Sequence, residues 1–257
     1  MTVEVSVVIP FFDEEESAPP LLAELRPVLD RLGRPYEVLV VNDGSRDATG
    51  EALRVAAAGW PEARVLELAR NQGQASALLC GLHAARGGVL VTLDGDGQND
   101  PADIPALLAR LEGADLVAGV RAQRHDSPLR RSMSRIANAV RARFLGDGLR
   151  DSGCALKAFR REVLDCLLPI RTLYSFIPAL AVGAGFRVVE APVAHRERER
   201  GRSKYGLRVM LWRPAVDMLG VKWFLSRRVP ARPPLAAAQD PPSARRVAGA
   251  AERAHGR

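Results

Sequence analysis

Two carboxylates, Asp94 and Asp96, stand two residues apart around a glycine in the run VLVTLDGDGQNDP, residues 89–101. In an extended chain, residues i and i+2 point to the same side, so both carboxylates can address one ligand. Hard divalent cations such as Mg²⁺ prefer oxygen ligands, usually one or two carboxylates together with substrate phosphates. The pattern is typical of a metal site that handles phosphates, but taken alone it is equally typical of a turn between a strand and a helix.

Acidic residues also follow other apolar runs of the chain. Residues 89–93 are β-branched and apolar, and they predict a buried strand that ends at Asp94. Two earlier apolar runs end in the same way, one at Asp13 and Glu14 and the other at Asp43. Ligands of open α/β sheets bind beyond the carboxyl ends of the strands, so the three acidic ends can line one crevice. Acid at three strand ends favours a ligand site over ordinary turn composition.

Strands and helices alternate along most of the chain, which predicts the α/β fold class, with a mostly parallel central sheet and helices on both faces. No GxGxxG motif follows the first strand and the sequence contains no GxxxxGK[ST] motif. This disfavours an NAD-dependent dehydrogenase and a P-loop NTPase. The expected strands are residues 3–9, 36–41, 64–68, 89–93, 114–120 and 186–190.

The composition is that of a globular protein from a reducing compartment. Its 47% hydrophobic content is ample for a core. The three cysteines are scattered, so we expect neither a disulfide framework nor a zinc site. The N-terminus runs directly into a strand, and no secretory signal is visible. We therefore expect a cytoplasmic protein.

Positive charge is concentrated at one end of the chain. Residues 196–257 contain 15 Lys/Arg against 5 Asp/Glu, whereas residues 1–195 contain 22 against 25. Such a basic end can meet nucleic acid, anionic lipid or phosphorylated substrates. The polar, glycine-hinged run of residues 195–206 is typical either of a loop that closes over an anionic ligand or of a solvated linker.

The run of residues 207–228 is amphipathic and rich in Trp, Leu and Met. Because it also contains Arg213, Asp217 and Lys222, we do not expect it to span a bilayer. Trp with flanking Arg and Lys favours a helix or helix pair in the membrane interface, broken near Pro214. The alternative is a C-terminal helix packed on the domain or on a second subunit. The expected division is a catalytic domain over 1–206, an amphipathic segment over 207–229 and a disordered basic tail over 230–257.

Taken together, the motifs of the chain resemble those of the family 2 glycosyltransferases with a GT-A fold. Within that family they look like the polyprenol-phosphate glycosyltransferases of the dolichol-phosphate mannose synthase type. The resemblance covers about residues 4–206. The matching pieces, in family order, are VSVVIPFFDEE, VLVVNDGSRDAT, ARNQGQASAL, LDGDGQNDP, AGVR, RRSMSRIAN, DSGCALKAFRREVL and RERGRSKYG.

The resemblance implies a donor side of the site. Asp94 and Asp96 match the DxD motif of the family, with Asp96 as the direct metal ligand and Asp94 shared between metal and nucleotide. Gln98 matches the Gln that follows near the donor phosphates. Gly95 and Gly97 stand where relatives commonly have Ala and Leu. The residues that match positions holding the nucleotide base and ribose are Pro10, Phe12, Asp13, Glu14 and Asp43.

The nucleotide side departs from the family pattern at one point. The family usually has Tyr-Asn where this chain has Phe12-Asp13. The phenol and the amide are therefore absent from the expected base contacts, and the identity of the donor nucleotide stays open.

The resemblance also implies an acceptor side. Arg121, Arg130 and Ser134 match positions that face the acceptor phosphate or the transferred sugar. Arg198 and Lys204 match a basic loop that neutralises phosphates. Asp151 matches a carboxylate that is sometimes given a catalytic role.

The implied reaction is inverting, metal-dependent transfer of a hexosyl group from a nucleotide-sugar, GDP-mannose or a UDP-sugar, to polyprenyl phosphate, with Mg²⁺ or Mn²⁺ as cofactor. The implied location is the cytoplasmic face of the membrane, with peripheral attachment to its surface. One alternative is a family 2 transferase that acts on a saccharide or other hydroxyl acceptor. Another is a basic nucleic-acid-binding protein, which the absence of a recognisable binding motif disfavours, so no nucleic acid partner is expected. Self-association into a homo-oligomer stays open.

Overall fold

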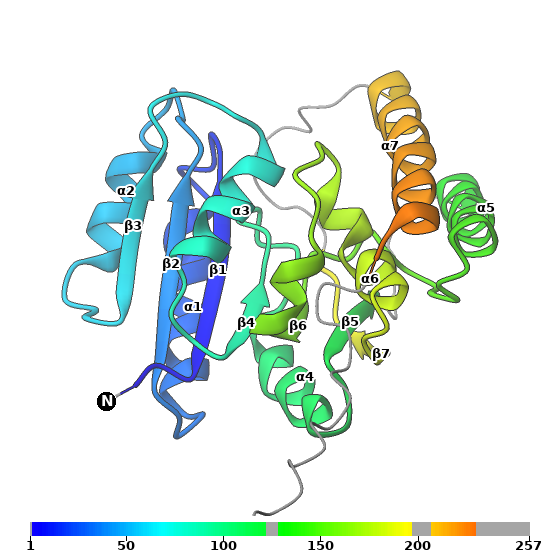
Figure 1. Cartoon of the computed structure of the whole chain (residues 1–257). Coiled ribbons are helices and arrows are strands. Elements are labelled where there is room, and N and C mark those ends of the chain that lie inside the picture. The colour runs from blue at the N-terminus through cyan, green and yellow to red at the C-terminus, as the bar shows by residue number, and fades with distance from the viewer. Residues whose placement is uncertain (1, 122–127, 197–206, 230–257) are drawn as a thin grey trace, which may run out of the picture.

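The computed structural model describes residues 2–121, 128–196 and 207–229, and only the backbone within residues 128–136 and 207–214 (Figure 1). Seven strands form one sheet in the order β3-β2-β1-β4-β6-β5-β7. The strands are β1 Val5–Phe11, β2 Tyr36–Asn42, β3 Ala63–Glu67, β4 Val89–Thr92, β5 Leu116–Arg121, β6 Lys157–Arg160 and β7 Val188–Val193. The α-helices are α1 Ala18–Asp30, α2 Thr49–Ala57, α3 Gln74–Ala84, α4 Ile104–Arg110, α5 Pro128–Leu145, α6 Leu173–Gly183 and α7 Leu207–Arg227.

The sheet is mostly parallel, as the alternating sequence predicts. β1 pairs in parallel with β2 and β4, β2 with β3, and β5 with β7. β6 is the exception, because it pairs antiparallel with both β4 and β5. Its first residue, Lys157, lies opposite Thr92 of β4 and Ala118 of β5. The amino end of β6 therefore lies at the edge where the parallel strands have their carboxyl ends.

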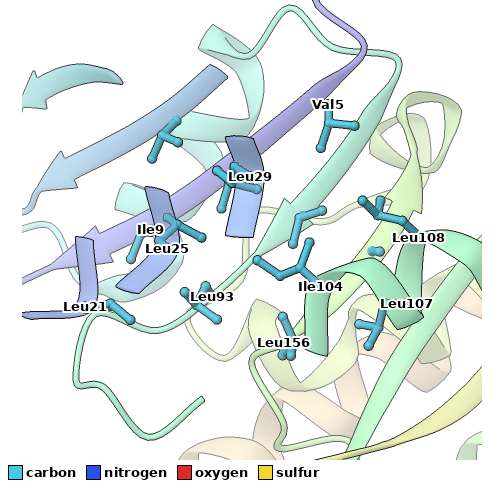
Figure 2. Packing of buried hydrophobic residues seen from close by; sticks show 14 of the residues in the cluster. Val5, Ile9, Leu21, Leu25, Leu29, Leu93, Ile104, Leu107, Leu108 and Leu156 are labelled. Atoms are coloured by element: carbon cyan, nitrogen blue, oxygen red, sulfur yellow. The ribbon is translucent and has the colours of Figure 1, made fainter. Parts of the chain in front are cut away.

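Helices cover both faces of the sheet, and each face has its own core. Successive strand residues point to opposite faces, so Val7 and Ile9 of β1 join one cluster while Val8 joins the other. On the first face, α1 and α4 pack over β1 and the chain that follows β4, as Figure 2 shows for Leu25 and Ile104. On the second face, the cluster contains apolar residues of α3, α6 and α7. This double covering leaves the strand ends as the places where polar groups can collect.

The C-terminal helix α7 is a single continuous helix of 21 residues that contains Pro214, so the predicted break near Pro214 is wrong. One of its faces packs on the domain: Val221 is buried, and Leu225 lies against Gly183 of α6. Asp217 accepts hydrogen bonds from the amide and the hydroxyl of Thr172, at 3.1 and 2.6 Å, next to the start of α6. No helix in the described ranges is long and apolar enough to cross a membrane. Packing on the domain is thus confirmed for one face of α7, and its place in a membrane interface stays a prediction.

Candidate active site at the carboxyl edge of the sheet

The two aspartates of the DGDG run lie at a turn rather than in an extended chain. β4 ends at Thr92, and the turn begins directly after Asp94. Gly95 lets this turn pack against the end of β1, because a Cβ atom there would lie 2.5 Å from the Phe11 ring and 2.8 Å from the Pro10 carbonyl oxygen. A larger residue at position 95 would displace the turn. The close approach, not an extended geometry, brings the two carboxylates to the sheet edge.

Each of the two carboxylates has one oxygen held by a neutral donor. The Gln74 side-chain amide donates to Asp94 Oδ1 at 2.6 Å, and the Gln98 backbone amide donates to Asp96 Oδ1 at 3.2 Å. Burial, together with the charge of Asp96, raises the pKa of Asp94 to about 7, although Lys157 and the Gln74 hydrogen bond act in the opposite direction.

This pair of carboxylates fits a divalent cation of the Mg²⁺ type. Mg²⁺ is usually bound through one or two carboxylates, and substrate phosphates and waters complete its coordination. Among the described residues, no group of three or more His, Cys, Asp or Glu side chains could enclose a metal ion by itself. A cation at Asp94 and Asp96 would therefore share its coordination with a ligand, as a phosphate-handling site requires.

Asp43, at the end of β2, is buried and engaged by the segment that precedes α3. Its carboxylate accepts hydrogen bonds from the Asn71 side chain at 2.8 Å, the Gln72 amide at 2.7 Å and the Gly73 amide at 2.9 Å. Burial raises the pKa of Asp43, and the two backbone amides act to lower it. Asp43 therefore holds the backbone of residues 71–73 in place, in addition to any contact with a nucleotide.

The acidic residues after β1 hold the neighbouring turn and the start of α1. Asp13 has a positive φ of 48°, a sparsely populated conformation that is often found at functional sites. Its carboxylate accepts a hydrogen bond from the Arg46 amide at 2.8 Å, and its own amide donates to the Ser45 hydroxyl at 3.0 Å. Glu14 is buried and accepts a hydrogen bond from the Ser17 hydroxyl at 3.1 Å.

Pro10 and Phe12 complete the predicted nucleotide side. Pro10 is buried in β1 opposite Val41, and Phe12 is partly exposed just beyond the strand. The structure therefore gathers all five of these predicted residues at the ends of β1 and β2, adjacent strands of the sheet.

Two residues of the predicted acceptor side, Arg121 and Asp151, form an ion pair. The guanidinium of Arg121 donates to both carboxylate oxygens, from Nε at 2.7 Å and from Nη2 at 2.8 Å, and both side chains are largely buried. Glu190 of β7 supports the pair, because its carboxylate accepts a hydrogen bond from the Asp151 amide at 3.3 Å. Such a two-point contact fixes the orientation of the guanidinium at the sheet edge.

Four other predicted residues cannot be described as fully. Arg130 and Ser134 belong to α5, but their side chains lie outside the described part of the chain. Arg198 and Lys204 lie outside the described residues altogether.

The segment after β7 joins the chain that follows the DGDG turn. Two hydrogen bonds join Arg196 and Gln98. The Arg196 amide donates to the Gln98 carbonyl oxygen at 2.9 Å, and Gln98 Nε2 donates to the Arg196 carbonyl oxygen at 3.4 Å. The Arg196 side chain forms ion pairs with Glu24 at 2.6 Å and Asp100 at 2.8 Å. The chain therefore leaves the described part at Arg196, beside the residues that follow the two aspartates.

Two residues at this edge were not predicted from the sequence. Gln74 stands in the ARNQGQASAL motif, but its contact with Asp94 depends on how α3 meets the sheet. Lys157 is a buried lysine whose ammonium donates to the Cys154 carbonyl oxygen. Burial lowers the pKa of Lys157, against the influence of nearby Asp94 and Asp151. A lone lysine inside the apolar run ALKAF was the only signal that could have pointed to it.

Several solved structures are similar to this chain in shape. A mycobacterial protein matches with a TM-score of 0.66 and 24% identity, covering 86% of this chain and 74% of its own. Glucosyl-3-phosphoglycerate synthase from Mycobacterium tuberculosis, in complex with Mn²⁺, uridine diphosphate and phosphoglyceric acid, matches with a TM-score of 0.66 and 21% identity. That match covers 86% of this chain and 78% of the synthase. The GT-A fold expected from the motifs is therefore confirmed.

Sequence relatives give a more specific comparison. The chain is 44% identical over 204 residues to the undecaprenyl-phosphate 4-deoxy-4-formamido-L-arabinose transferase of Pseudomonas fluorescens, which covers 78% of this chain and 60% of the relative. The transferase of the same name from Edwardsiella ictaluri is 43% identical over 206 residues, covering 79% of this chain and 63% of the relative. The chain thus spans about 60% of the length of these relatives. The glycosyl transferase family 2 model matches residues 6–168, which contain the DGDG turn and the Arg121–Asp151 pair, and the chain belongs to that family.

Proposed function

We propose that this chain transfers a sugar from a nucleotide-sugar to polyprenyl phosphate. The names of its relatives, which are transferases acting on undecaprenyl phosphate, support this class of acceptor. The sugar in those names, 4-deoxy-4-formamido-L-arabinose, is one donor group to test beside mannose, glucose and N-acetylglucosamine.

The observation that supports a phosphate as the acceptor group is the ion pair between Arg121 and Asp151. A hydroxyl acceptor needs a carboxylate base to remove its proton, and Asp151 is the candidate base that the sequence offers. Both of its oxygens accept hydrogen bonds from the guanidinium of Arg121, so it is poorly placed to accept a proton from a substrate. A lipid phosphate oxygen is already anionic and needs no strong base. The ion pair therefore favours a phosphate over a hydroxyl as the nucleophile.

In this proposal the basic residues bind phosphates and the acidic residues bind the metal and the nucleotide. Arg121 holds the acceptor phosphate, with Arg130, Ser134, Arg198 and Lys204 assigned to phosphates and sugar by the family resemblance. Holding the two anionic reactants in line is the main catalytic task, since neither needs chemical activation by a base.

The donor side is assigned to the ends of β1, β2 and β4. Asp94 and Asp96 would hold Mg²⁺ or Mn²⁺, which as a Lewis acid would stabilise the departing diphosphate. Gln98 is assigned to the donor phosphates. The nucleotide is assigned to Pro10, Phe12, Asp13, Glu14 and Asp43. The glucosyl-3-phosphoglycerate synthase of similar fold was crystallised with Mn²⁺ and uridine diphosphate, which supports a divalent cation and a nucleotide as ligands.

A polyprenyl acceptor places the reaction at a membrane. We assign the chain to the cytoplasmic face, attached peripherally through the exposed face of α7 and its basic neighbours. The exposed apolar residues Leu219 and Trp223 and the cations Lys222 and Arg227 support this assignment, because anionic lipid attracts Lys and Arg close to its surface.

The decisive experiment incubates the protein with Mg²⁺ or Mn²⁺ and each labelled nucleotide-sugar, offering undecaprenyl phosphate, a free sugar or DNA in separate reactions. Label should enter the lipid fraction only with undecaprenyl phosphate. Label in the free sugar would favour the hydroxyl-acceptor alternative. Binding to DNA without any transfer would favour the nucleic-acid alternative.

The substitution Asp96→Ala should abolish metal-dependent transfer, by at least about a hundredfold, while the thermal unfolding midpoint stays near that of the wild type. Glu112→Ala is a matched control, because Glu112 is exposed and lies in the turn between α4 and β5. Full transfer by the Asp96→Ala protein would show that the assignment of Asp96 to the metal is wrong.

A further inference from the structure

The first helical residue of α3 makes direct contact with the carboxylate pair. Gln74 Nε2 donates to Asp94 Oδ1 at 2.6 Å, a short and well-formed hydrogen bond. Within the described part of the chain, this is the only hydrogen bond that the Asp94 side chain accepts. A neutral donor adds no compensating positive charge, and it fixes one carboxylate oxygen so that the other is presented in a defined direction.

The segment that supplies Gln74 is itself tied to the other side of the site. Gln72 and Gly73 donate their backbone amides to Asp43, at the end of β2, while Gln74 reaches Asp94, beyond the end of β4. β1 lies between these two strands in the sheet, so the segment passes over the carboxyl end of β1. One short stretch of chain therefore holds the carboxylates of both neighbouring strands.

The position of α3 on the sheet leaves little freedom for this contact to shift. At Gly81, a Cβ atom would lie 2.3 Å from Val8 Cγ1 and 3.0 Å from Val41 Cγ2, so the helix rests directly on β1 and β2. Ala77 and Leu82 of the same helix are fully buried. The helix that carries Gln74 is thus fixed by its packing, and Gln74 is held where it meets Asp94.

We infer that Gln74 is a positioning residue for the metal site: it orients Asp94 as a ligand and thereby sets the affinity for the divalent cation. The inference rests on the proposed metal role of Asp94 and Asp96. Hydrogen bonds to metal-ligating side chains fix their orientation, and their loss typically weakens metal affinity or activity by 10- to 100-fold. Gln74→Leu keeps a similar volume but removes the donor, so it should raise the dissociation constant for Mn²⁺ about tenfold.

The test is a titration of the full chain with Mn²⁺ alone, in which electron paramagnetic resonance measures the free ion. The matched control is Gln72→Leu, two residues away, whose side chain is exposed and whose contact with Asp43 is made by the backbone. Its dissociation constant should stay within about twofold of the wild type. Gln74→Ala provides a second, smaller substitution, and the thermal unfolding midpoint of each variant reports on folding.

A double substitution separates positioning from a general structural effect. If Gln74 acts through Asp94, then Gln74→Leu should change the affinity of an Asp94→Asn protein by less than about twofold. The inference is overturned if folded Gln74→Leu and Gln74→Ala proteins bind Mn²⁺ as the wild type does, or if the full loss persists in the Asp94→Asn background. Equal Mn²⁺ binding by the wild type and Asp96→Ala would instead show that the proposed metal site is wrong, and the inference would fall with it.

Discussion

At the scale of single residues, Asp94 and Asp151 are both carboxylates at one edge of the sheet, yet they are held by different partners. Asp94 accepts one hydrogen bond from a neutral amide, which brings no compensating positive charge. Asp151 accepts two hydrogen bonds from a guanidinium, which compensates its charge. Under the proposed function, the same functional group binds a metal in one place and orients an arginine in the other.

This difference predicts the kinetic effect of Asp151→Asn. An asparagine oxygen still accepts one hydrogen bond from Arg121, but the charge that fixes the guanidinium is gone. The KM for polyprenyl phosphate should therefore rise about tenfold, equivalent to about 1.4 kcal/mol, while the dependence of kcat on pH keeps its shape. Steady-state kinetics over a range of acceptor concentrations and pH measure both quantities.

If Asp151 were instead a general base, its substitution would have a different kinetic effect. Loss of a base should lower kcat by about a hundredfold or more and remove a limb of its pH profile. Glu112→Gln, which changes an exposed carboxylate elsewhere, should leave KM and kcat at their wild-type values. A base-like result with Asp151→Asn would favour a hydroxyl acceptor over a phosphate.

At the scale of elements, Glu37 joins several strands at the edge opposite the candidate site. It lies near the amino end of β2, is almost fully buried, and accepts hydrogen bonds from Ser6 of β1 at 2.8 Å and Arg64 of β3 at 2.9 Å. It also accepts from the amide and side chain of Arg86, just before β4. A single carboxylate therefore connects β1 and β3 to the segment that leads into β4.

These contacts predict how stability depends on pH. Burial acts to raise the pKa of Glu37, but the hydrogen bonds from Arg86, Ser6 and Arg64 outweigh it, so the pKa lies below its ordinary value of 4.5. A lowered folded-state pKa stabilises the protein above the unfolded-state value, and this stabilisation is lost as the pH falls through the folded-state pKa. Glu37→Gln should cost about 2 kcal/mol at pH 7. The difference from wild type should shrink below about pH 4.5.

Chemical denaturation at a series of pH values measures this effect as the free energy of unfolding. Glu4→Gln is the control, since Glu4 is an exposed carboxylate just before β1. A difference between Glu37→Gln and wild type that stays constant from pH 7 to below pH 4 would contradict the assigned role of Glu37.

The elements show which parts of the fold the sequence can reveal. Continuous apolar runs predicted β2 to within one residue of its observed bounds and β1 two residues too early, because a buried parallel strand needs a continuous apolar run. β6 is only four residues long, and its antiparallel direction comes from its pairing with β4 and β5 rather than from its own composition. That pairing is also what places Lys157 at the site edge. Strand ends could be predicted locally, whereas this direction could not.

The candidate site shows the same division. The acidic types and their places after the strands could be predicted, because they follow the apolar runs directly. Their partners could not: the donors to Asp43 come from residues 28 to 30 positions away, and the donor to Asp94 comes from a residue 20 positions away. The Arg121–Asp151 pair likewise joins residues 30 positions apart. Such contacts are fixed by how helices and loops meet the sheet, which no local pattern encodes.

At the scale of the whole molecule, α7 has two faces with different environments. Val221 and Leu225 pack on the domain and Asp217 is bonded to Thr172, so the helix is fixed on the domain. On the other side, Leu219 is 60% exposed and Trp223 is 66% exposed, four residues apart on one face of the helix. The domain therefore carries an apolar strip on a fixed helix, and a polyprenyl acceptor requires a membrane-facing surface of this kind.

This strip predicts how the protein binds lipid vesicles. Burying a large apolar side chain in the interface contributes about 1.5–3 kcal/mol, and each nearby Lys or Arg contributes about 1 kcal/mol on anionic lipid. Leu219→Gln and Trp223→Gln should each weaken binding to vesicles of phosphatidylglycerol and phosphatidylcholine about tenfold, and binding of the wild type should fall as salt rises. Flotation of vesicles on a density gradient measures the bound fraction. Val55→Gln, which changes an apolar residue that is 64% exposed on α2, should leave binding unchanged. If Leu219→Gln and Trp223→Gln both leave vesicle binding at the wild-type level, α7 does not hold the protein on the membrane, and its exposed face must be explained by another contact.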